Sequence, residues 1–207
     1  MPQPRKLHDR YFKQAKAEGY VARSAYKLLE INSKFRIVRA GDRVLDLGCA
    51  PGSWMQVATK AVGAGGLVVG VDLQAVGPGI APGAATVQGD IFKVDPATLL
   101  ELSGSMFDVI LSDMAPATTG HGDDFLSVRL CRRVLEILPP LLSPGGSLAM
   151  KVLEGEEFPE LLREVRALFP RVKGFKPDSS RDVSREMFIV ADGYRPPTPT
   201  RPLRSAT

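Results

Sequence analysis

The sequence is poor in cysteine and histidine and has no long apolar run. Its 207 residues include two histidines and two cysteines, Cys49 and Cys131. Two cysteines make neither a disulfide framework nor a metal cluster, so we expect a reducing compartment and no bound metal. No apolar run approaches the ~20 residues that a membrane-spanning helix needs, and no apolar core follows the basic N-terminus. We therefore expect a cytoplasmic protein without a membrane span or a secretory signal.

The chain also lacks an internal repeat and the length that two domains need. At 207 residues it suits one α/β domain with a proper core, and 44% apolar and 24% charged residues are ordinary for a soluble globular protein. Residues 194–207 carry prolines without apolar periodicity, which predicts a disordered tail. We place the single domain at residues 37–193 and expect a monomer.

Acidic residues are scarce at the start of the chain. Residues 1–36 hold nine Lys and Arg against three Asp and Glu, a net charge of +6, whereas the other 171 residues carry −2. Four aromatic residues are interleaved with these charges: Tyr11, Phe12, Tyr20 and Tyr26. Such a composition is typical of a surface that binds phosphates and stacks bases. The alternative is a solvated basic helix whose aromatic side chains turn to the core, and charge alone does not decide between the two.

Short β-rich runs alternate with longer helical patterns from residue 43 onward. Seven runs predict strands, at residues 43–47, 67–72, 85–88, 107–112, 147–153, 171–176 and 186–191. Helices are predicted at residues 8–18, 24–35 (with Ser24 as N-cap), 53–62, 96–102, 124–142 and 157–168. This alternation is typical of an α/β fold with a doubly wound, mostly parallel sheet and helices on both faces. The last two strands leave no room for a helix between them, so we expect an antiparallel last strand.

The chain lacks the GxGxxG motif that holds a pyrophosphate in nicotinamide-binding sheets. Its first strand ends instead in a looser turn from Gly48 to Gly52, which we assign to a cofactor site. Asp72 and Asp90 end the next two strands, where one carboxylate can accept ribose hydroxyls and the other an adenine amino group. A site that has a ribose-binding acid but no phosphate-binding loop suits a ligand that contains adenosine but no phosphates. S-adenosylmethionine is the common cofactor of that kind. The alternative is a generic turn with surface aspartates.

At these positions the sequence resembles the FtsJ/RrmJ (RlmE) family of ribosomal RNA 2′-O-ribose methyltransferases. The resemblance spans about residues 8 to 193. Five segments carry it: "GYVARSAYKLLEI" (19–31), "VLDLGCAPGSW" (44–54), "GVDL" (70–73), "LSDMAP" (111–116) and "KPDSSRDVSREMFIVA" (176–191), with "MKVLEG" (150–155) as a looser sixth. It implies a Rossmann-like S-adenosylmethionine-dependent methyltransferase fold with a seven-stranded sheet, and an N-terminal extension, residues 1–36, that binds RNA. The residues it implies are a catalytic set of Lys27, Asp113, Lys151 and Glu186, and cofactor contacts from Gly52, Trp54, Asp72, Asp90 and Asp113.

Methylation of a ribose hydroxyl independently requires a base. A hydroxyl is a poor nucleophile until its proton is removed, whereas a sulfonium methyl group needs only in-line placement. Lys151 lies in an otherwise apolar strand, "LAMKVL", where desolvation and a second cation favour the neutral amine, so we expect it to be the general base. Lys27 would steer the substrate, Asp113 would orient Lys151, and Glu186 would fix the lysine geometry. The alternative is that the Lys151 side chain reaches solvent from the end of its strand. Composition alone favours this alternative, whereas the family resemblance favours the general base.

The resemblance also implies a substrate: large-subunit (23S) ribosomal RNA, within the large ribosomal subunit, at the uridine of the A loop. The nearest alternative is 2′-O-methylation of transfer RNA or another RNA. An alternative of a different class is a non-catalytic ribosome assembly factor, against which the four intact catalytic residues argue. Base N-methylation is disfavoured because the fourth strand ends in "SDMAP" where such enzymes carry an Asn-Pro-Pro-aromatic run.

Overall fold

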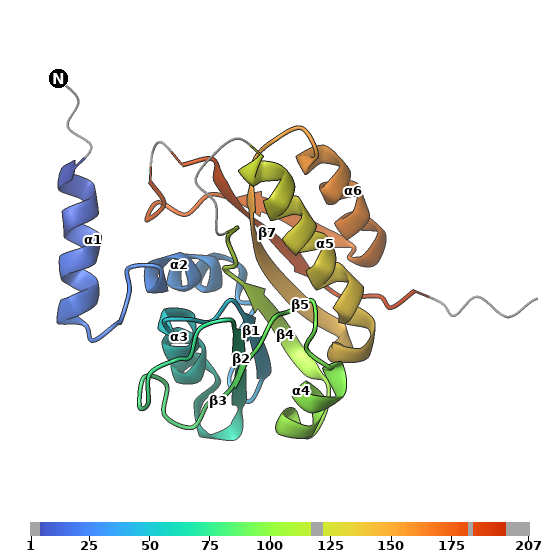
Figure 1. Ribbon diagram of the computed structural model, residues 1–207, viewed down its shortest axis with the longest axis horizontal. Helices are drawn as coiled ribbons and strands as arrows, with labels where there is room; N and C mark the ends of the chain where they lie inside the picture. Colours follow the sequence, from blue (N-terminus) through green and yellow to red (C-terminus); the bar gives the residue numbers. More distant parts are fainter. Residues whose placement is uncertain (1–4, 117–121, 182–183, 198–207) are drawn as a thin grey trace, which may run out of the picture.

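The computed structural model describes residues 5–116, 122–181 and 184–197, and its centre is one sheet with helices on both faces (Figure 1). The strands are β1 (Arg43–Leu47), β2 (Leu67–Asp72), β3 (Ala85–Gln88), β4 (Phe107–Ser112), β5 (Leu142–Leu153), β6 (Arg171–Phe175) and β7 (Glu186–Asp192). The helices are α1 (Arg5–Ala17), α2 (Ala25–Phe35), α3 (Ser53–Val62), the 3₁₀ turn η1 (Gly63–Gly65), α4 (Pro96–Ser103), α5 (Asp123–Leu141) and α6 (Phe158–Leu168).

The seven strands lie in the order β3-β2-β1-β4-β5-β7-β6. The pairs from β3 to β5 are all parallel, whereas β7 runs antiparallel to both of its neighbours, β5 and β6. The predicted mostly parallel sheet with an antiparallel last strand is thus confirmed. The strand order reverses between β1 and β4, and ligands of open α/β sheets bind beyond the carboxyl ends of the strands at such a point.

Alternating residues of each strand enter two cores, one on each face of the sheet. On β1, Val44 packs with residues of α2 and α3, whereas Leu45 and Leu47 pack with residues of α4, α5 and α6. Figure 1 shows these two groups of helices on opposite sides of the sheet. Because successive strand residues point to opposite faces, this register decides which polar residues share a face near the site.

Several elements extend beyond their predicted boundaries, and the helix predicted at residues 8–18 is α1, which begins at Arg5. β5 begins at Leu142, not at residue 147, because Leu142 pairs with Phe107 before the register shifts and Ser147 pairs with Val109. The packed domain also continues past residue 193, since Tyr194 is buried against Phe169 and the amide of the next residue donates to the Leu168 carbonyl. Residues 198–207 of the predicted tail lie outside the described part of the chain.

The proposed N-terminal extension divides into two parts. α2 belongs to the core, because Ala25, Leu28 and Ile31 are fully buried under the sheet, and only α1 lies apart from the sheet (Figure 1). The Tyr26 ring packs 5.4 Å from that of Tyr11 and 6.1 Å from that of Tyr20. The rings of these three tyrosines therefore pack against one another, whereas Phe12 is 62% exposed.

Candidate active site

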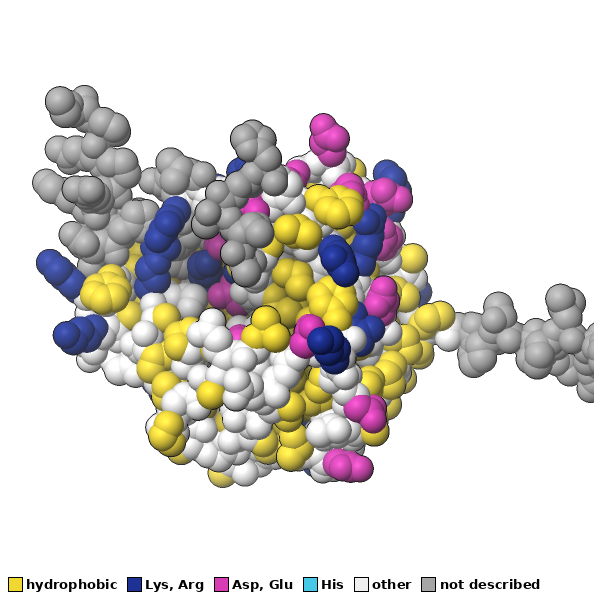
Figure 2. Space-filling model, in the orientation of Figure 1, with side chains coloured by type: hydrophobic (Ala, Val, Ile, Leu, Met, Phe, Trp, Pro, Cys, Tyr) yellow, Lys and Arg dark blue, Asp and Glu magenta, His cyan; other side chains and the backbone are white. Residues whose placement is uncertain are grey.

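A cavity of about 680 Å³ lies beyond the carboxyl ends of β1, β2 and β4 and is bounded by α5. Four of the residues assigned to the cofactor site line it: Gly48, Asp72, Asp90 and Asp113. The apolar lining includes Val71, Ile91, Met114 and Leu130, which the sequence analysis did not single out. Figure 2 shows hydrophobic side chains gathered in the middle of this face, with Lys and Arg side chains on both sides of them. A mostly apolar cavity of this size with a few carboxylates is typical of a small-molecule site.

Gly48 gives the turn after β1 the backbone shape that the cavity needs. Its φ of +77° lies in the left-handed region, and an added Cβ would lie 2.6 Å from Met114 Cγ and 3.0 Å from the Met114 backbone. Any side chain would therefore push the turn away from the segment that follows β4. The carboxylate of Asp72 holds the same turn, because its Oδ2 accepts the amide of Ala50 at 2.9 Å.

Two strand-end acids give the cavity its polar recognition groups. The second oxygen of Asp72 accepts the amide of Gln74 at 2.8 Å, and Asp90 Oδ1 accepts that of Phe92 at 3.0 Å. These bonds fix both carboxylates in direction, and a carboxylate oxygen has two lone pairs, so each can still accept a ligand hydroxyl or amino group. Fixed acceptors beside an apolar lining are chemically suited to adenosine.

Gly52 and Trp54 are not among the residues that line this cavity. The Trp54 side chain is buried, its ring lies 5.6 Å from that of Phe188, and its Nε1 donates to the Ser24 carbonyl at 2.9 Å. Ser24 itself does not cap α2 with its hydroxyl, which instead bonds the Ser53 hydroxyl at 2.7 Å. Trp54 therefore ties the start of α3 to the start of α2.

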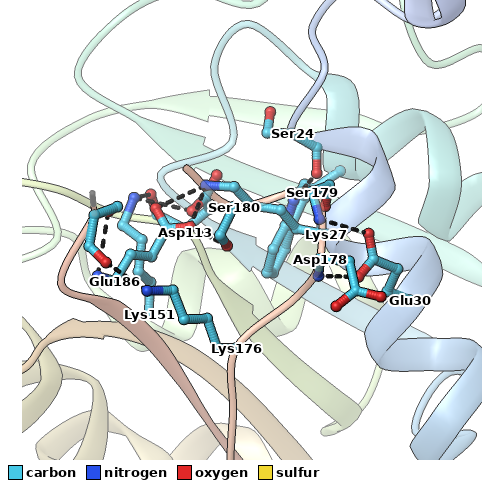
Figure 3. Close-up of polar contacts among 12 residues, drawn as sticks. Ser24, Lys27, Glu30, Asp113, Lys151, Lys176, Asp178, Ser179, Ser180 and Glu186 are labelled. Atoms are coloured by element: carbon cyan, nitrogen blue, oxygen red, sulfur yellow. Dashed lines mark hydrogen bonds and ion pairs between the residues drawn. The ribbon is translucent and has the colours of Figure 1, made fainter. Parts of the chain in front are cut away.

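The four residues of the predicted catalytic set lie together on the α2 side of the sheet (Figure 3). The two-residue period explains three of them, since Leu111, Ala149 and Phe188 pack on that face and residues two positions away share it. These neighbours are Asp113, Lys151 and Glu186. α2 covers the face and supplies the fourth residue, Lys27.

Two ion pairs join the set. Lys27 Nζ lies 2.7 Å from the Glu186 carboxylate, and both side chains are about nine-tenths buried. Lys151 Nζ donates to the Asp113 carboxylate at 2.9 Å and to the Asp113 carbonyl at 2.6 Å. Asp113 also lines the cavity, so one residue joins the amine of Lys151 to the proposed cofactor site.

Burial and neighbouring charges act in opposite directions on Glu186. Burial alone raises the pKa of its carboxyl, but the Lys27 ammonium, then Lys151 and a hydrogen bond from Ser180, outweigh burial and hold the pKa below its usual range. Glu186 is thus an anion whose charge the lysines stabilise.

A fifth acid, Asp46, is buried next to this site. It is fully buried on β1, and neither carboxyl oxygen has a hydrogen-bond partner among the described residues. Burial first, and then the charges of Asp113 and Asp72, raise the pKa of Asp46 well above its ordinary value. The unfolded chain therefore releases this proton at a lower pH than the folded chain does.

Asp46→Asn is expected to make the stability less dependent on pH. As the pH rises from the ordinary carboxyl pKa through the raised one, wild type loses stability, by about 1.4 kcal/mol for each unit of difference between the folded and unfolded pKa. The amide is neutral throughout, so the variant should unfold at a higher urea concentration at neutral pH. Urea unfolding between about pH 4 and pH 8 measures this, with the exposed Glu101→Gln as control. Parallel profiles for wild type and Asp46→Asn would contradict the assignment.

No group of three or more His, Cys, Asp or Glu side chains suited to a metal ion occurs within residues 10–116, 122–181 and 184–197. No helix in that described part of the chain is long and apolar enough to cross a membrane.

Comparison with known protein families identifies the family of this chain. The model of a family described as FtsJ-like methyltransferase matches residues 20–194. The chain belongs to the FtsJ-like methyltransferase family. The resemblance found in the sequence motifs is thereby confirmed.

Relatives of this FtsJ-like methyltransferase cover most of its length. A protein named ribosomal RNA large subunit methyltransferase E from Syntrophobacter fumaroxidans is 45% identical over 186 residues, which are 89% of this chain and 94% of the relative. A protein of the same name from Granulibacter bethesdensis is 44% identical over 195 residues, 93% of this chain and 83% of the relative.

Two solved structures share the fold. A protein described as a ribosomal RNA methyltransferase from Plasmodium falciparum superposes with a TM-score of 0.76 and 27% identity, covering 84% of this chain and 98% of that one. Fibrillarin from Aeropyrum pernix, solved with natively bound S-adenosyl-L-methionine, superposes with a TM-score of 0.60 and 19% identity, covering 84% and 75%. The implied Rossmann-like methyltransferase fold is confirmed.

Proposed function

We propose that this FtsJ-like methyltransferase transfers a methyl group from S-adenosylmethionine to a ribose 2′-hydroxyl of large-subunit ribosomal RNA, at the uridine of the A loop. The relatives named ribosomal RNA large subunit methyltransferase E support the substrate class. One structural observation carries the chemistry: Asp113 both lines the cavity and holds the Lys151 amine. A base and a bound methyl donor would thus meet at the same residue.

The cavity residues fit S-adenosylmethionine. Asp72 and Asp90 would hold the adenosine, and the close approach of Gly48 to Met114 would shape the turn beside it. Gly52 and Trp54 keep a supporting role in this proposal, since they fix the turn and the start of α3. When bound, the cofactor supplies an electrophilic methyl group on a positively charged sulfur.

Lys151 is the proposed general base. Once its ammonium has released a proton, Lys151 would take the proton of the 2′-hydroxyl as the hydroxyl oxygen bonds to the methyl carbon. The bond from that carbon to the sulfonium sulfur would break and leave a neutral thioether. The ammonium so formed is received by two acceptors already in place, the carboxylate and the carbonyl of Asp113. Lys27, held by Glu186 on the same face of the sheet, places a positive charge where the ribose or its phosphate would lie. Proximity of these groups, rather than a covalent intermediate, supplies the acceleration.

The N-terminal helix fits the same substrate. Arg10, Lys13 and Lys16 of α1 are exposed, and the exposed Phe12 ring lies among them. Positive side chains that neutralise RNA phosphates give affinity without sequence preference, and an exposed ring can stack on an unpaired base. We propose that α1 binds the RNA around the target nucleotide, with the protein acting as a monomer on the large subunit in the cytoplasm.

Methyl transfer to defined ribosomal particles tests this function. Large subunits from cells that lack the protein are incubated with it and labelled S-adenosylmethionine, and the modified nucleotide is mapped. We expect one labelled 2′-O-methyluridine in the A loop. Subunits from cells that contain the protein are the matched control and should accept little label, because the target 2′-hydroxyl is already methylated. Label at transfer RNA or elsewhere, or no transfer despite cofactor binding, would overturn the proposed target.

A further inference from the structure

The segment between β6 and β7 is fastened to α2 at two points. At the first point, Glu30 accepts two backbone amides with its carboxylate: Asp178 N at 2.6 Å and Ser179 N at 3.1 Å. At the second, Lys27 binds Glu186, the first residue of β7. Lys27 and Glu30 are three residues apart on α2 and so share one face of the helix. The helix therefore holds this segment on both sides of the turn at Ser180.

Ser180 completes the surroundings of Glu186. Its amide donates to the Pro177 carbonyl at 3.0 Å, which closes a turn, and its hydroxyl donates to Glu186 Oε1 at 2.9 Å. Lys27 Nζ donates to Oε2 and also lies 2.7 Å from Oε1, so the ammonium spans both oxygens. The Ser180 side chain is buried, so this donor is not exchanged freely with water. Figure 3 shows Glu30 with Asp178 and Ser179, and Ser180, Lys27 and Glu186 near them.

We propose that Ser180 and Glu30 are positioning residues of methyl transfer. Glu30 fixes the turn, the turn presents the Ser180 hydroxyl, and that hydroxyl fixes the Glu186 carboxylate to which Lys27 is bound. A glutamate and a lysine have many rotamers. The Ser180 hydroxyl on Oε1, together with the Lys27 ammonium across both oxygens, leaves the Glu186 carboxylate one orientation. The Lys27 ammonium is thereby held at one place beside the ribose. This inference rests on the methyl transfer proposed above.

The other end of β7 offers a built-in comparison. Asp192, its last residue, accepts the Ser147 hydroxyl at 3.0 Å and pairs with Arg171. This serine, acid and base repeat the types of group found in Ser180, Glu186 and Lys27. They lie at the opposite end of the strand from the catalytic set, so removal of the Ser147 hydroxyl should affect folding alone.

The test compares Ser180→Ala with Ser147→Ala in the full chain. We expect Ser180→Ala to lower kcat about tenfold, because a displaced charge at the reacting group has effects of this order. The KM for S-adenosylmethionine should not change. At acid pH, where kcat already falls with protonation of the general base, the further fall from protonation of Glu186 should begin at a higher pH than in wild type, because Glu186 loses a donor that lowers its pKa. Ser180→Thr, which keeps the hydroxyl, should retain most of the wild-type kcat. The kcat of Glu30→Gln should lie between those of Ser180→Ala and wild type.

Each outcome decides the inference. Wild-type kcat and an unshifted pH profile in Ser180→Ala would overturn it, and so would an equal loss of kcat in Ser147→Ala, since both losses would then reflect stability. If circular dichroism shows Ser180→Ala to be unfolded, Ser180→Cys, similar in volume but a weak donor, is judged by the same criteria. Absence of methyl transfer by wild type would count against the proposed function instead, because the inference is tested by comparing the kcat of each variant with that of an active wild type.

Discussion

Lys151→Ala is expected to lower kcat for methyl transfer by about 10²- to 10⁴-fold, the usual contribution of a general base. Cofactor affinity should stay near that of wild type, because Lys151 is not among the residues that line the cavity. Asp113 would lose an ion-pair partner, but it opens into the cavity, where water can solvate its carboxylate. Single-turnover transfer of a labelled methyl group measures the chemical step, and calorimetry with S-adenosylmethionine measures binding.

Lys151→Arg separates a base from a fixed positive charge. A guanidinium keeps the cation and can still donate to Asp113, but it cannot give up its proton under these conditions and so cannot accept one from the ribose. We expect this variant to be as inactive as Lys151→Ala. Lys173→Ala, on the exposed side of β6, is the control and should retain wild-type kcat. Substantial transfer by the arginine variant would mean that Lys151 acts only through its charge.

Most of the fold follows from periodicity, because a sheet covered on both faces requires nearly continuous apolar strands. β1, β2, β3 and β4 begin and end where the apolar runs do. The start of β5 was missed because Leu142 pairs with Phe107 ahead of a register shift, and no local pattern reports a shift that depends on a neighbouring strand. Tyr194 was assigned to the tail for a similar reason, since its partner Phe169 lies 25 residues away in sequence.

The proposed catalytic set could be predicted only in part from the residues alone. An apolar strand with a single lysine identifies Lys151 as unusual, but α2 contributes Lys27 by covering a strand 159 residues away. That contact became an expectation through the family motif, not through spacing. Glu30 and Ser180 carried no signal of their own, because a glutamate on a helix and a serine in a turn are ordinary at the surface. Their roles depend on a contact across 148 residues.

The buried pair of Lys27 and Glu186 predicts a large effect on stability. Lys27→Met leaves the Glu186 carboxylate without its cation in a site where both side chains are about nine-tenths buried. Loss of one partner from such a pair destabilises by about 3–5 kcal/mol. Urea unfolding measures the change in the free energy of unfolding. Arg171→Met, which breaks the exposed pair with Asp192, is the control and should cost less than about 1 kcal/mol.

The loss in Lys27→Met should also depend on pH. The lowered pKa of Glu186 means that its ionised form stabilises the folded wild type above the ordinary carboxyl pKa and that this contribution is lost as the pH falls through the lowered one. Without Lys27, burial raises the pKa of Glu186 instead, so the carboxylate takes up a proton at mildly acidic pH. The gap in stability between wild type and Lys27→Met should therefore narrow as the pH is lowered.

The double variant Lys27→Met with Glu186→Leu separates a role of the ion pair in folding from a role in methyl transfer. With neither charge present, no uncompensated ion is buried, and apolar side chains of similar volume replace a buried pair at little or no loss. We expect the double variant to recover most of the stability that Lys27→Met loses while it stays inactive in methyl transfer. A double variant as unstable as Lys27→Met would show that the pair is required by the fold itself. Recovery without activity would instead mean that the chain keeps two buried charges, which the fold does not need, for the placement of Lys27 beside the ribose.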